Sequence, residues 1–467
     1  MRPERRRFLA AGLAGLAGAG IAGCLDEDGA GDDQVPSDPS ADDDPTATPV
    51  DEPDYDLSVE HDLERWDGYD PDWTAPTDPP TLDVDVETVV EGLEVPWDLA
   101  FAPNGDLFVS ERVGRITRYD GADLDPVATP DVIDHADSIA PGEEGDWWGG
   151  GSEGGLMGIA VHPNYPDVPL VYAVYTHQAG DEDYRNRVVY YDVDADDPGE
   201  TETVVVDGIP GHEIIHNGSR IAFGPANYLW VTTGDAEDRE TPPDPNSLGG
   251  KVLRLEPDGS PAADNPDLGG DERVYSLGHR NPQGISFLPD GSPIVTEHGP
   301  AARDEVQIVG PGDDHGWGPE EATGRDGDTY PGTDFDRPVA HSGTDTTWAP
   351  AGCVFTTEAA PESWRRRLLV GGLISQRLVA VTPYLRDGDV EPATDAGDGR
   401  RHDADWMDDE YDAVTHTALR DELGRIRHVE QAPDGAIYAV TSNRDGRASD
   451  EFPGEDDDRL VRLTPAE

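Results

Sequence analysis

Residues 96–119, PWDLAFAPNGDLFVSERVGRITRY, contain the pattern that decides the fold. Three short apolar runs follow one another at 96–101, 107–109 and 115–119, and the third alternates basic and apolar residues. A Pro-Asn-Gly turn at 103–105 separates the first two runs, and Asn-Gly between apolar runs is a strong hairpin signal. The stretch is therefore predicted to form consecutive antiparallel strands.

The same unit recurs along the rest of the chain, with further copies beginning near residues 156, 221, 285, 353 and 426. A radial array of such sheets leaves no long exposed edge. Residues 83–467 are therefore predicted to form an all-β, six-bladed β-propeller. A β-sandwich or two all-β domains is the alternative, and it is disfavoured because the repeat continues without a linker. The inserts near 121–150, 236–250 and 311–345 are expected to be long loops.

The composition is strongly acidic, with 100 acidic against 33 basic residues and a formal net charge of -67 over 467 residues. Such a charge excludes a nucleic-acid partner. So many like charges repel one another, but at 1 M salt the Debye length falls to about 3 Å and most of this repulsion is screened. Lys251 is the only lysine, and arginine supplies every other fixed cation. We interpret the chain as halophilic, the alternative being an acidic protein of ordinary salt.

The first 24 residues have the features of an export signal. Arg5-Arg6-Arg7-Phe8-Leu9 precedes an apolar run that is too short to span a membrane comfortably, and the arginine pair resembles a twin-arginine signal. The run ends in Ile21-Ala22-Gly23-Cys24, which resembles a lipobox with Cys24 as the lipidated residue. We expect residues 25–82 to be a disordered acidic tether. The protein is thus predicted to be extracytoplasmic, at the cell surface, and held to the membrane by lipid.

Cys353 is the only other cysteine, so no intrachain disulfide is expected if Cys24 is lipidated. It lies in an apolar run and is predicted to be a small core residue.

Polar motifs stand at the start of several units. His216 precedes the third, Arg280 and Asn281 precede the fourth, and Arg425 and Arg427 open the sixth. In a propeller these positions surround one central mouth. Histidine is the natural base near neutral pH, and arginine offers a planar fork for carboxylates. Each residue alone has a structural explanation, but together they favour a site for a small polyanionic ligand.

A loop after the fourth unit's second run is rich in oxygen ligands. It contains Gly299 and Pro300, followed by Asp304 and Glu305. Carboxylates and turn carbonyls are hard ligands that suit calcium, although the spacing matches no EF-hand.

Taken in order, the motifs resemble those of the soluble aldose dehydrogenases that use pyrroloquinoline quinone, the glucose/sorbosone dehydrogenase family. The residues that carry the resemblance are Glu153-Gly154-Gly155-Leu156-Met157-Gly158, His162-Pro163, His216-Asn217-Gly218-Ser219-Arg220, Arg280-Asn281-Pro282-Gln283-Gly284, His298-Gly299-Pro300, Gly316-Trp317-Gly318-Pro319 and Gly424-Arg425-Ile426-Arg427.

The resemblance implies a quinoprotein that oxidises an aldose sugar or related alcohol to its lactone and passes electrons to a further acceptor. His216 would be the general base, while hydride passes to the quinone, and Arg280 would stabilise charge developing on the cofactor. The residues implied to contact the cofactor are Glu153, Arg280, Asn281, Arg425 and Arg427. Carbonyls of Gly299 and Pro300 would hold calcium.

One departure from the family's pattern motivates a second hypothesis. Ile374 stands where the family usually has a lysine in the fifth unit. A propeller that no longer binds the quinone and serves as a carbohydrate-binding or scaffold protein is therefore one alternative. A calcium-dependent, lactonase-like propeller is the other, because a fold does not fix a function.

Overall fold

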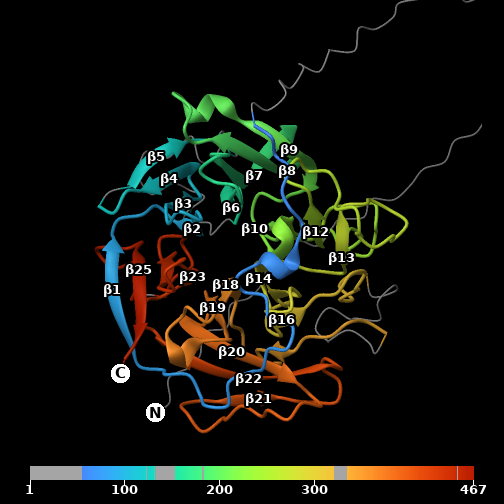
Figure 1. Ribbon diagram of the computed structural model, residues 1–467, viewed down its shortest axis with the longest axis vertical. Helices are drawn as coiled ribbons and strands as arrows, with labels where there is room; N and C mark the ends of the chain where they lie inside the picture. The colour runs from blue at the N-terminus through green and yellow to red at the C-terminus, as the bar shows by residue number, and fades with distance from the viewer. Residues whose placement is uncertain are drawn as a thin grey trace, which may run out of the picture. The chain divides into compact units, whose positions relative to one another are not determined.

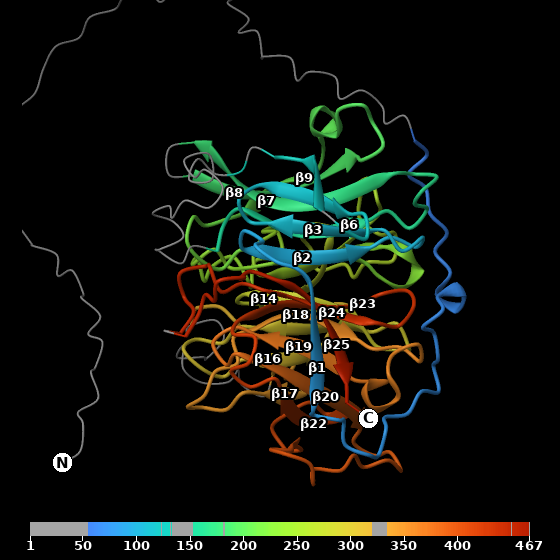
Figure 2. The same ribbon diagram turned by 90° about the vertical axis from the view of Figure 1, so that its left-hand side faces the viewer.

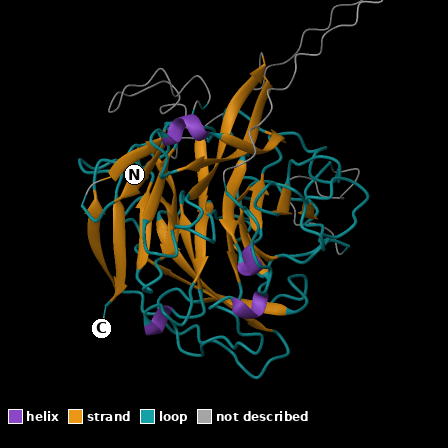
Figure 3. Cartoon of the chain, turned by 45° about the horizontal axis from the view of Figure 1, so that its top comes forward, coloured by secondary structure: helices purple, strands orange, loops and turns teal. Residues whose placement is uncertain are grey.

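Six antiparallel β-sheets stand side by side as the blades of a propeller (Figure 1). The computed structural model describes residues 55–122, 124–130, 132, 153–180, 183–319, 334–449 and 451–466. Regular structure in these residues is almost entirely strand, with four short 3-10 helices in between (Figure 3). The prediction of an all-β, six-bladed β-propeller is confirmed.

The blades follow the repeat predicted from the sequence. Blade one contains β2 (Pro96–Phe101), β3 (Leu107–Glu111), β4 (Arg115–Tyr119) and β5 (Leu124–Ala128). Blade two contains β6 (Leu156–Val161), β7 (Leu170–Gly180), β8 (Asp183–Asp192) and β9 (Thr203–Pro210). Blade three contains β10 (Gly218–Phe223), β11 (Leu229–Thr233), β12 (Lys251–Leu255) and β13 (Val274–Leu277).

Blade four contains β14 (Pro282–Phe287), β15 (Pro293–Glu297), β16 (Glu305–Ile308) and β17 (Ala340–His341). Blade five contains β18 (Pro350–Phe355), β19 (Leu368–Gly372), β20 (Arg377–Leu385), β21 (Arg400–His402) and β22 (Tyr411–Ala418). Blade six contains β23 (Ile426–Gln431), β24 (Ile437–Thr441), β25 (Leu460–Pro465) and β1 (Val84–Val90). The 3-10 helices are η1 (Leu63–Arg65), η2 (Pro198–Thr201), η3 (Pro225–Asn227) and η4 (Glu362–Trp364).

The predicted turns set the register of the hairpins. In blade one, Phe101 pairs with Leu107 across the Pro-Asn-Gly turn, and the amide of Ala102 donates to the carbonyl of Asp106 at 2.8 Å. Gly105 has φ 94, which glycine adopts without steric cost. The turn therefore fixes which face of each strand meets the neighbouring blade.

The ring is closed by a strand from the other end of the chain. β1 pairs antiparallel with β25, from Val84 opposite Pro465 to Val90 opposite Leu460 (Figure 2). Blade six thus combines the strand that precedes the first repeat with the three strands of the last repeat. Hydrogen bonds between the two ends close the propeller and cover an edge that would otherwise be exposed.

The core lies between the blades. The first strands of neighbouring blades, β2, β6, β10, β14, β18 and β23, pack against one another around the axis. Every residue of β3, β11, β15 and β19, the second strands of four blades, is buried. Cys353 on β18 is 2% exposed within an apolar cluster, so its prediction as a core residue is confirmed.

Residues 55–82, predicted to belong to the disordered tether, instead form a strap that packs along one side of the propeller (Figure 2). Trp73 is 9% exposed and meets Phe355 edge-on with ring centroids 5.6 Å apart. The indole of Trp364 donates to the carbonyl of Thr81 at 2.9 Å. The composition of this segment is acidic and rich in proline, which predicts disorder. Its few aromatic side chains nevertheless bury enough apolar surface to hold the segment against the propeller.

We expect Trp73→Ala to lower the free energy of unfolding by about 3 kcal/mol, because truncating a buried aromatic residue loses its packing and leaves a cavity. Denaturant unfolding followed by circular dichroism measures this change. Asp72→Ala, at an exposed neighbouring position, is the matched control and should change stability little. An unchanged unfolding midpoint for Trp73→Ala would mean that the strap does not contribute to stability.

Several sequence predictions lie outside the described residues. These are the export signal, Cys24, residues 25–54, and most of the insert near 121–150. Among the described residues, no helix has the length and apolar character needed to cross a membrane. The insert at 236–250 is a loop of turns, as predicted, and the described parts of the insert at 311–345 are mainly loop as well.

Candidate functional site

The predicted site residues meet at the mouth where the first strands begin. Glu153, just before β6, is the centre of this arrangement. Its Oε2 accepts from the backbone amide of His216 at 3.2 Å, from Asn281 Nδ2 at 3.4 Å and from Gln283 Nε2 at 3.3 Å. Glu153 thereby joins blades two, three and four, and the expected convergence on one mouth is present.

A carboxylate fixes the orientation of the candidate base. The Nδ1 of His216 lies 2.7 Å from Oδ1 of Asp235, which is 1% exposed. The indole of Trp317 donates to the other oxygen of Asp235 at 2.6 Å. An ionised carboxylate only accepts, so Nδ1 of His216 carries the proton and Nε2 is left with its lone pair. No described residue forms a hydrogen bond with that Nε2.

The backbone around His216 is held in an uncommon conformation. His216 has φ 61, a region that costs free energy for a residue with a side chain. Gly234 allows its backbone to lie close to that of His216, because a Cβ at residue 234 would be only 1.9 Å from the carbonyl oxygen of His216. The amide of Gly218 donates to Asn281 Oδ1 at 3.0 Å and fixes the exit of the turn. The chain thus holds His216 at the start of β10 through contacts from two neighbouring strands.

Arginines surround two carboxylates of the mouth, Asp445 and Glu153. Asp445 Oδ2 accepts from Arg425 Nε at 2.9 Å and lies 3.5 Å from Nη2 of Arg427. Arg447 Nη1 donates to Glu153 Oε1 at 2.8 Å. Arg112, on the first blade, donates through Nε to the carbonyl of Gly154 at 3.2 Å.

The electrostatic environment of this cluster is positive. Burial opposes ionisation of Glu153, but the charges of Arg447 and His298 outweigh it and lower the pKa of Glu153 to about 2. Burial, followed by the charge of Arg427, lowers the pKa of Arg112 to about 9. Both shifts follow from cations crowded into a space with little water.

Arg280 lies on the other side of the histidine. Its Nη1 donates to the carbonyl of His298 at 3.1 Å, and its guanidinium carbon lies 5.4 Å from the centroid of the Trp317 ring. Its backbone amide donates to Glu297 at 2.6 Å. Two buried guanidinium nitrogens of the site, Nε of Arg280 and Nε of Arg427, have no hydrogen-bond partner among the described residues. These two N–H groups are therefore available to donate hydrogen bonds to an anionic ligand at the mouth.

The two carboxylates predicted to bind metal, Asp304 and Glu305, accept hydrogen bonds from neighbouring residues. Asp304 accepts from the amide of Gly299 at 3.0 Å and from the Thr347 hydroxyl at 2.6 Å, and the amides of Trp348 and Ala349 also donate to it. Asp304 thus holds two loops together, with three of these hydrogen bonds to Oδ2 and one to Oδ1. Glu305 accepts from Gln307 Nε2 at 2.7 Å.

The described residues contain no cluster of three or more histidine, cysteine or acidic side chains arranged to hold a metal ion. Calcium binding at Gly299, Pro300, Asp304 and Glu305 therefore stays a prediction. The Pro300 carbonyl already accepts from the amide of Ala302 at 2.6 Å.

Ile374 stands where the family resemblance places a lysine, so this position carries no positive charge. Ile374 is 62% exposed. The cation beside Glu153 comes instead from Arg447, in the loop that follows β24. Arg447, Asp445, Asp235 and Arg112 were not predicted. Asp235 and Arg112 follow directly after second strands, which run antiparallel to the first strands and so end at the same mouth. Their position after a second strand was the signal in the sequence by which these two site residues could have been found.

The sequence profile of the glucose/sorbosone dehydrogenase family matches residues 93–450. The aldose sugar dehydrogenase of Escherichia coli (strain K12) is 27% identical over 399 residues, covering 80% of this chain and 93% of that protein. The putative oxidoreductase (glucose dehydrogenase) of Thermus thermophilus superposes with a TM-score of 0.64 at 36% identity, covering 82% of this chain and 100% of that one.

The aldose sugar dehydrogenase of Streptomyces coelicolor, solved in its PQQ-bound form, superposes with a TM-score of 0.61 at 33% identity, covering 82% of this chain and 99% of that one. These matches span the blades that carry His216, Arg280 and Arg427. The chain therefore belongs to the glucose/sorbosone dehydrogenase family.

Proposed function

We propose that the protein oxidises an aldose sugar or a related alcohol to the lactone with pyrroloquinoline quinone, and that His216 is the general base. One observation carries this proposal. The imidazole, oriented by Asp235 with its Nε2 open, stands beside the arginines 112, 280, 425, 427 and 447 in a chain whose net charge is -67. A group of arginines gathered at one mouth of so acidic a protein indicates an anionic ligand.

The donor set fits the proposed cofactor, which has three carboxylates. We assign Arg425 and Arg427 to these carboxylates because both are buried and aimed at the mouth, with Asp445 as their present counter-ion. Asn281 and Arg112 complete the polar wall. When bound, the quinone supplies the acceptor for the hydride of the sugar.

His216 provides the base for the substrate hydroxyl. Its Nε2 accepts the hydroxyl proton, and the resulting imidazolium lies 2.7 Å from the Asp235 carboxylate, which stabilises its charge. Because the ring is already oriented, little reorganisation is needed when the proton moves. Positioned bases of this kind contribute about 10²–10⁴-fold to the rate.

Calcium binding is proposed only at the carbonyls of Gly299 and Pro300. The loop that carries them is held by Asp304, which accepts from the Gly299 amide at 3.0 Å. Backbone carbonyls are hard ligands of the kind calcium prefers, with water or ligand oxygens filling the other positions. Export and lipidation at Cys24 stay proposals drawn from the signal sequence alone. Function in concentrated salt is also a proposal, and it is drawn from the acidic composition.

The test is reconstitution of the purified protein. We expect pyrroloquinoline quinone with calcium to make the protein reduce a redox dye in the presence of aldoses, with saturation in both cofactor and sugar. A folded protein that neither binds the cofactor nor turns over any aldose would contradict the proposal. It would favour a non-catalytic carbohydrate-binding propeller.

A further inference from the structure

A second cavity lies at the other end of the first strands. It has a volume of about 700 Å³ and is lined by residues at the ends of β2, β6, β10 and β23, including Phe101, Val161, Phe223 and Gln431. His216, by contrast, precedes β10. A strand of six residues spans about 20 Å, so the cavity and the His216 mouth are separate sites.

The strap covers this cavity. Glu60, Asp62, Arg65, Trp66 and Asp67 line it. They are fixed by contacts at the end of blade three. Asn227 Nδ2 donates to the carbonyl of Glu60 at 2.9 Å, and the His61 ring stacks on Tyr228 with centroids 4.1 Å apart. Two ordered parts of the chain, the strap and the ends of the first strands, therefore form the sides of the cavity.

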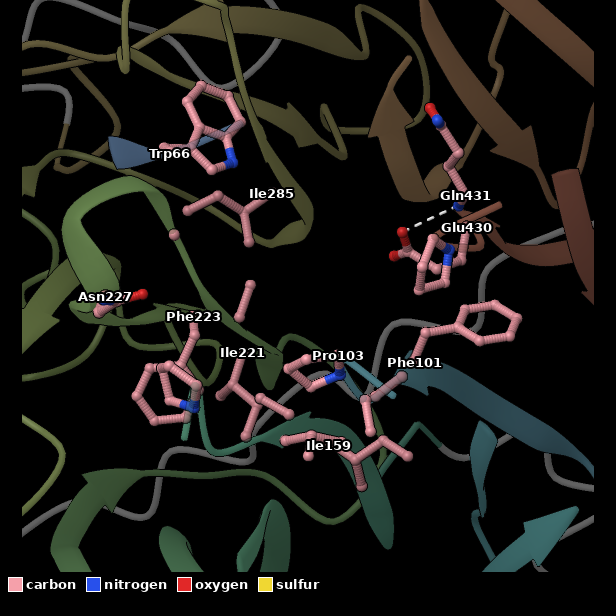
Figure 4. Close-up of a pocket in the computed structure, with 18 of the residues that line it drawn as sticks. Trp66, Phe101, Pro103, Ile159, Ile221, Phe223, Asn227, Ile285, Glu430 and Gln431 are labelled. Carbon is pink, nitrogen blue, oxygen red and sulfur yellow. Dashed lines mark hydrogen bonds between the residues drawn. The ribbon is translucent and has the colours of Figure 1, made fainter. Parts of the chain in front are cut away.

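A buried polar group forms the inner end of the cavity. Arg220 and Asp98, both at most 2% exposed, form an ion pair. His428 Nε2 lies 3.3 Å from Asp98 Oδ1 and 3.3 Å from Glu430 Oε2. Glu430 accepts from the amide of Gln431 at 2.9 Å, and its side chain is 29% exposed (Figure 4). Glu430 is thus the member of the group that reaches the open space.

The charge of the lining is negative. Its two arginines are already paired, Arg65 with Glu60 and Arg220 with Asp98. Among the described residues, no arginine or lysine forms an ion pair with Asp62, Asp67 or Glu430. Burial raises the pKa of Glu430 to about 8, so near neutral pH the negative charge comes from Asp62 and Asp67, and a bound cation would favour the ionised form of Glu430.

Part of the wall is apolar and aromatic. Trp66 lies on one side of the cavity, and Phe101, Ile221 and Phe223 lie on the other (Figure 4). Aromatic faces attract organic cations, most strongly where water is excluded. Apolar walls with aromatic rings and uncompensated carboxylates select a ligand that has an apolar body and a positive charge.

We propose that this cavity binds a small organic ammonium cation, with Glu430 and Asp67 as its counter-charges and Trp66, Phe101 and Phe223 as its aromatic walls. The site does not depend on the proposed oxidation at His216. It assigns a second ligand to the opposite end of the propeller.

Titration of the full chain with benzyltrimethylammonium, followed by calorimetry or ligand-observed NMR, tests the site. At about pH 9, where Glu430 is ionised, we expect saturable binding with one cation per chain. Binding should be at least about tenfold weaker for the neutral benzyl alcohol, which lacks the Coulombic and cation–π attraction. Glu430→Gln should weaken binding of the cation by about tenfold or more for the same reason.

Three further variants locate the site. Glu422→Gln, at an exposed position, and Glu153→Gln, at the His216 mouth, make the same chemical change elsewhere and should leave binding of the cation unchanged. Asp67→Asn, on the exposed side of the strap, should weaken binding without touching the buried group, so it decides the outcome if Glu430→Gln does not fold. The proposal is overturned by absence of saturable binding, by equal affinity in Glu430→Gln and Asp67→Asn, or by loss of binding in Glu153→Gln.

Discussion

His216→Gln is expected to lower kcat by about 10²–10⁴-fold, the contribution of a positioned general base. Glutamine fills a similar space and can still donate to Asp235, which lies 2.7 Å from the histidine ring, but its amide nitrogen has no lone pair to accept a proton. The affinity for the cofactor should change little, because the arginines that we assign to its carboxylates are untouched. Steady-state dye reduction together with cofactor titration separates the two effects.

His177→Gln is the matched control for this variant. His177 lies on β7 with Nε2 3.4 Å from Asp207, outside the His216 mouth, so its replacement should leave kcat unchanged. Full activity in His216→Gln would show that another group removes the hydroxyl proton. Loss of cofactor binding in His216→Gln would instead assign this residue a structural role.

Arg427→Gln is expected to weaken binding of pyrroloquinoline quinone by about 30-fold or more, because truncating one partner of a buried charge pair costs about 2–5 kcal/mol. Arg427 is 2% exposed, and Nη1 donates to Gln283 Oε1 at 3.0 Å, so its guanidinium is already oriented toward the mouth. At saturating cofactor, kcat should fall much less than affinity. Cofactor titration of dye reduction measures both quantities.

The control removes an arginine of the same region from the surface. Arg420 is 48% exposed and pairs with Asp398, so Arg420→Gln should leave cofactor affinity unchanged. Thermal unfolding in the absence of cofactor shows whether the Arg427 variant is folded. A folded Arg427→Gln protein with normal affinity would remove this residue from the cofactor site and leave Arg425 as the principal cation.

The repeating part of the fold could be predicted because its signals are local. The apolar alternation within each strand has a period of two, and turns such as that at Gly105 need a residue that tolerates positive φ. Both patterns lie within a few residues of sequence. His216, Arg280 and Arg427 were also found this way, since each lies at the start of a first strand and the ring brings those starts together.

The strap and the closing strand depended on contacts that no local pattern contains. Trp73 lies in an acidic, proline-rich stretch, and only its packing on Phe355, far along the chain, reveals that the stretch is ordered. β1 likewise gains its partner from the last strand, β25, by pairing the two ends of the propeller.

The sequence by itself determined the six blades, their turns and the residues that begin each first strand, because short-range periodicity and turn chemistry encode them. Only the tertiary structure decided which charges meet. Arg447 reaches Glu153 across 294 positions of sequence, Asp235 orients His216 from the end of a neighbouring strand, and Asp304 accepts hydrogen bonds from the amides of Trp348 and Ala349. The physical reason is that ion pairs and hydrogen bonds depend on distances of a few ångströms, which closure of the ring sets between residues far apart in the chain.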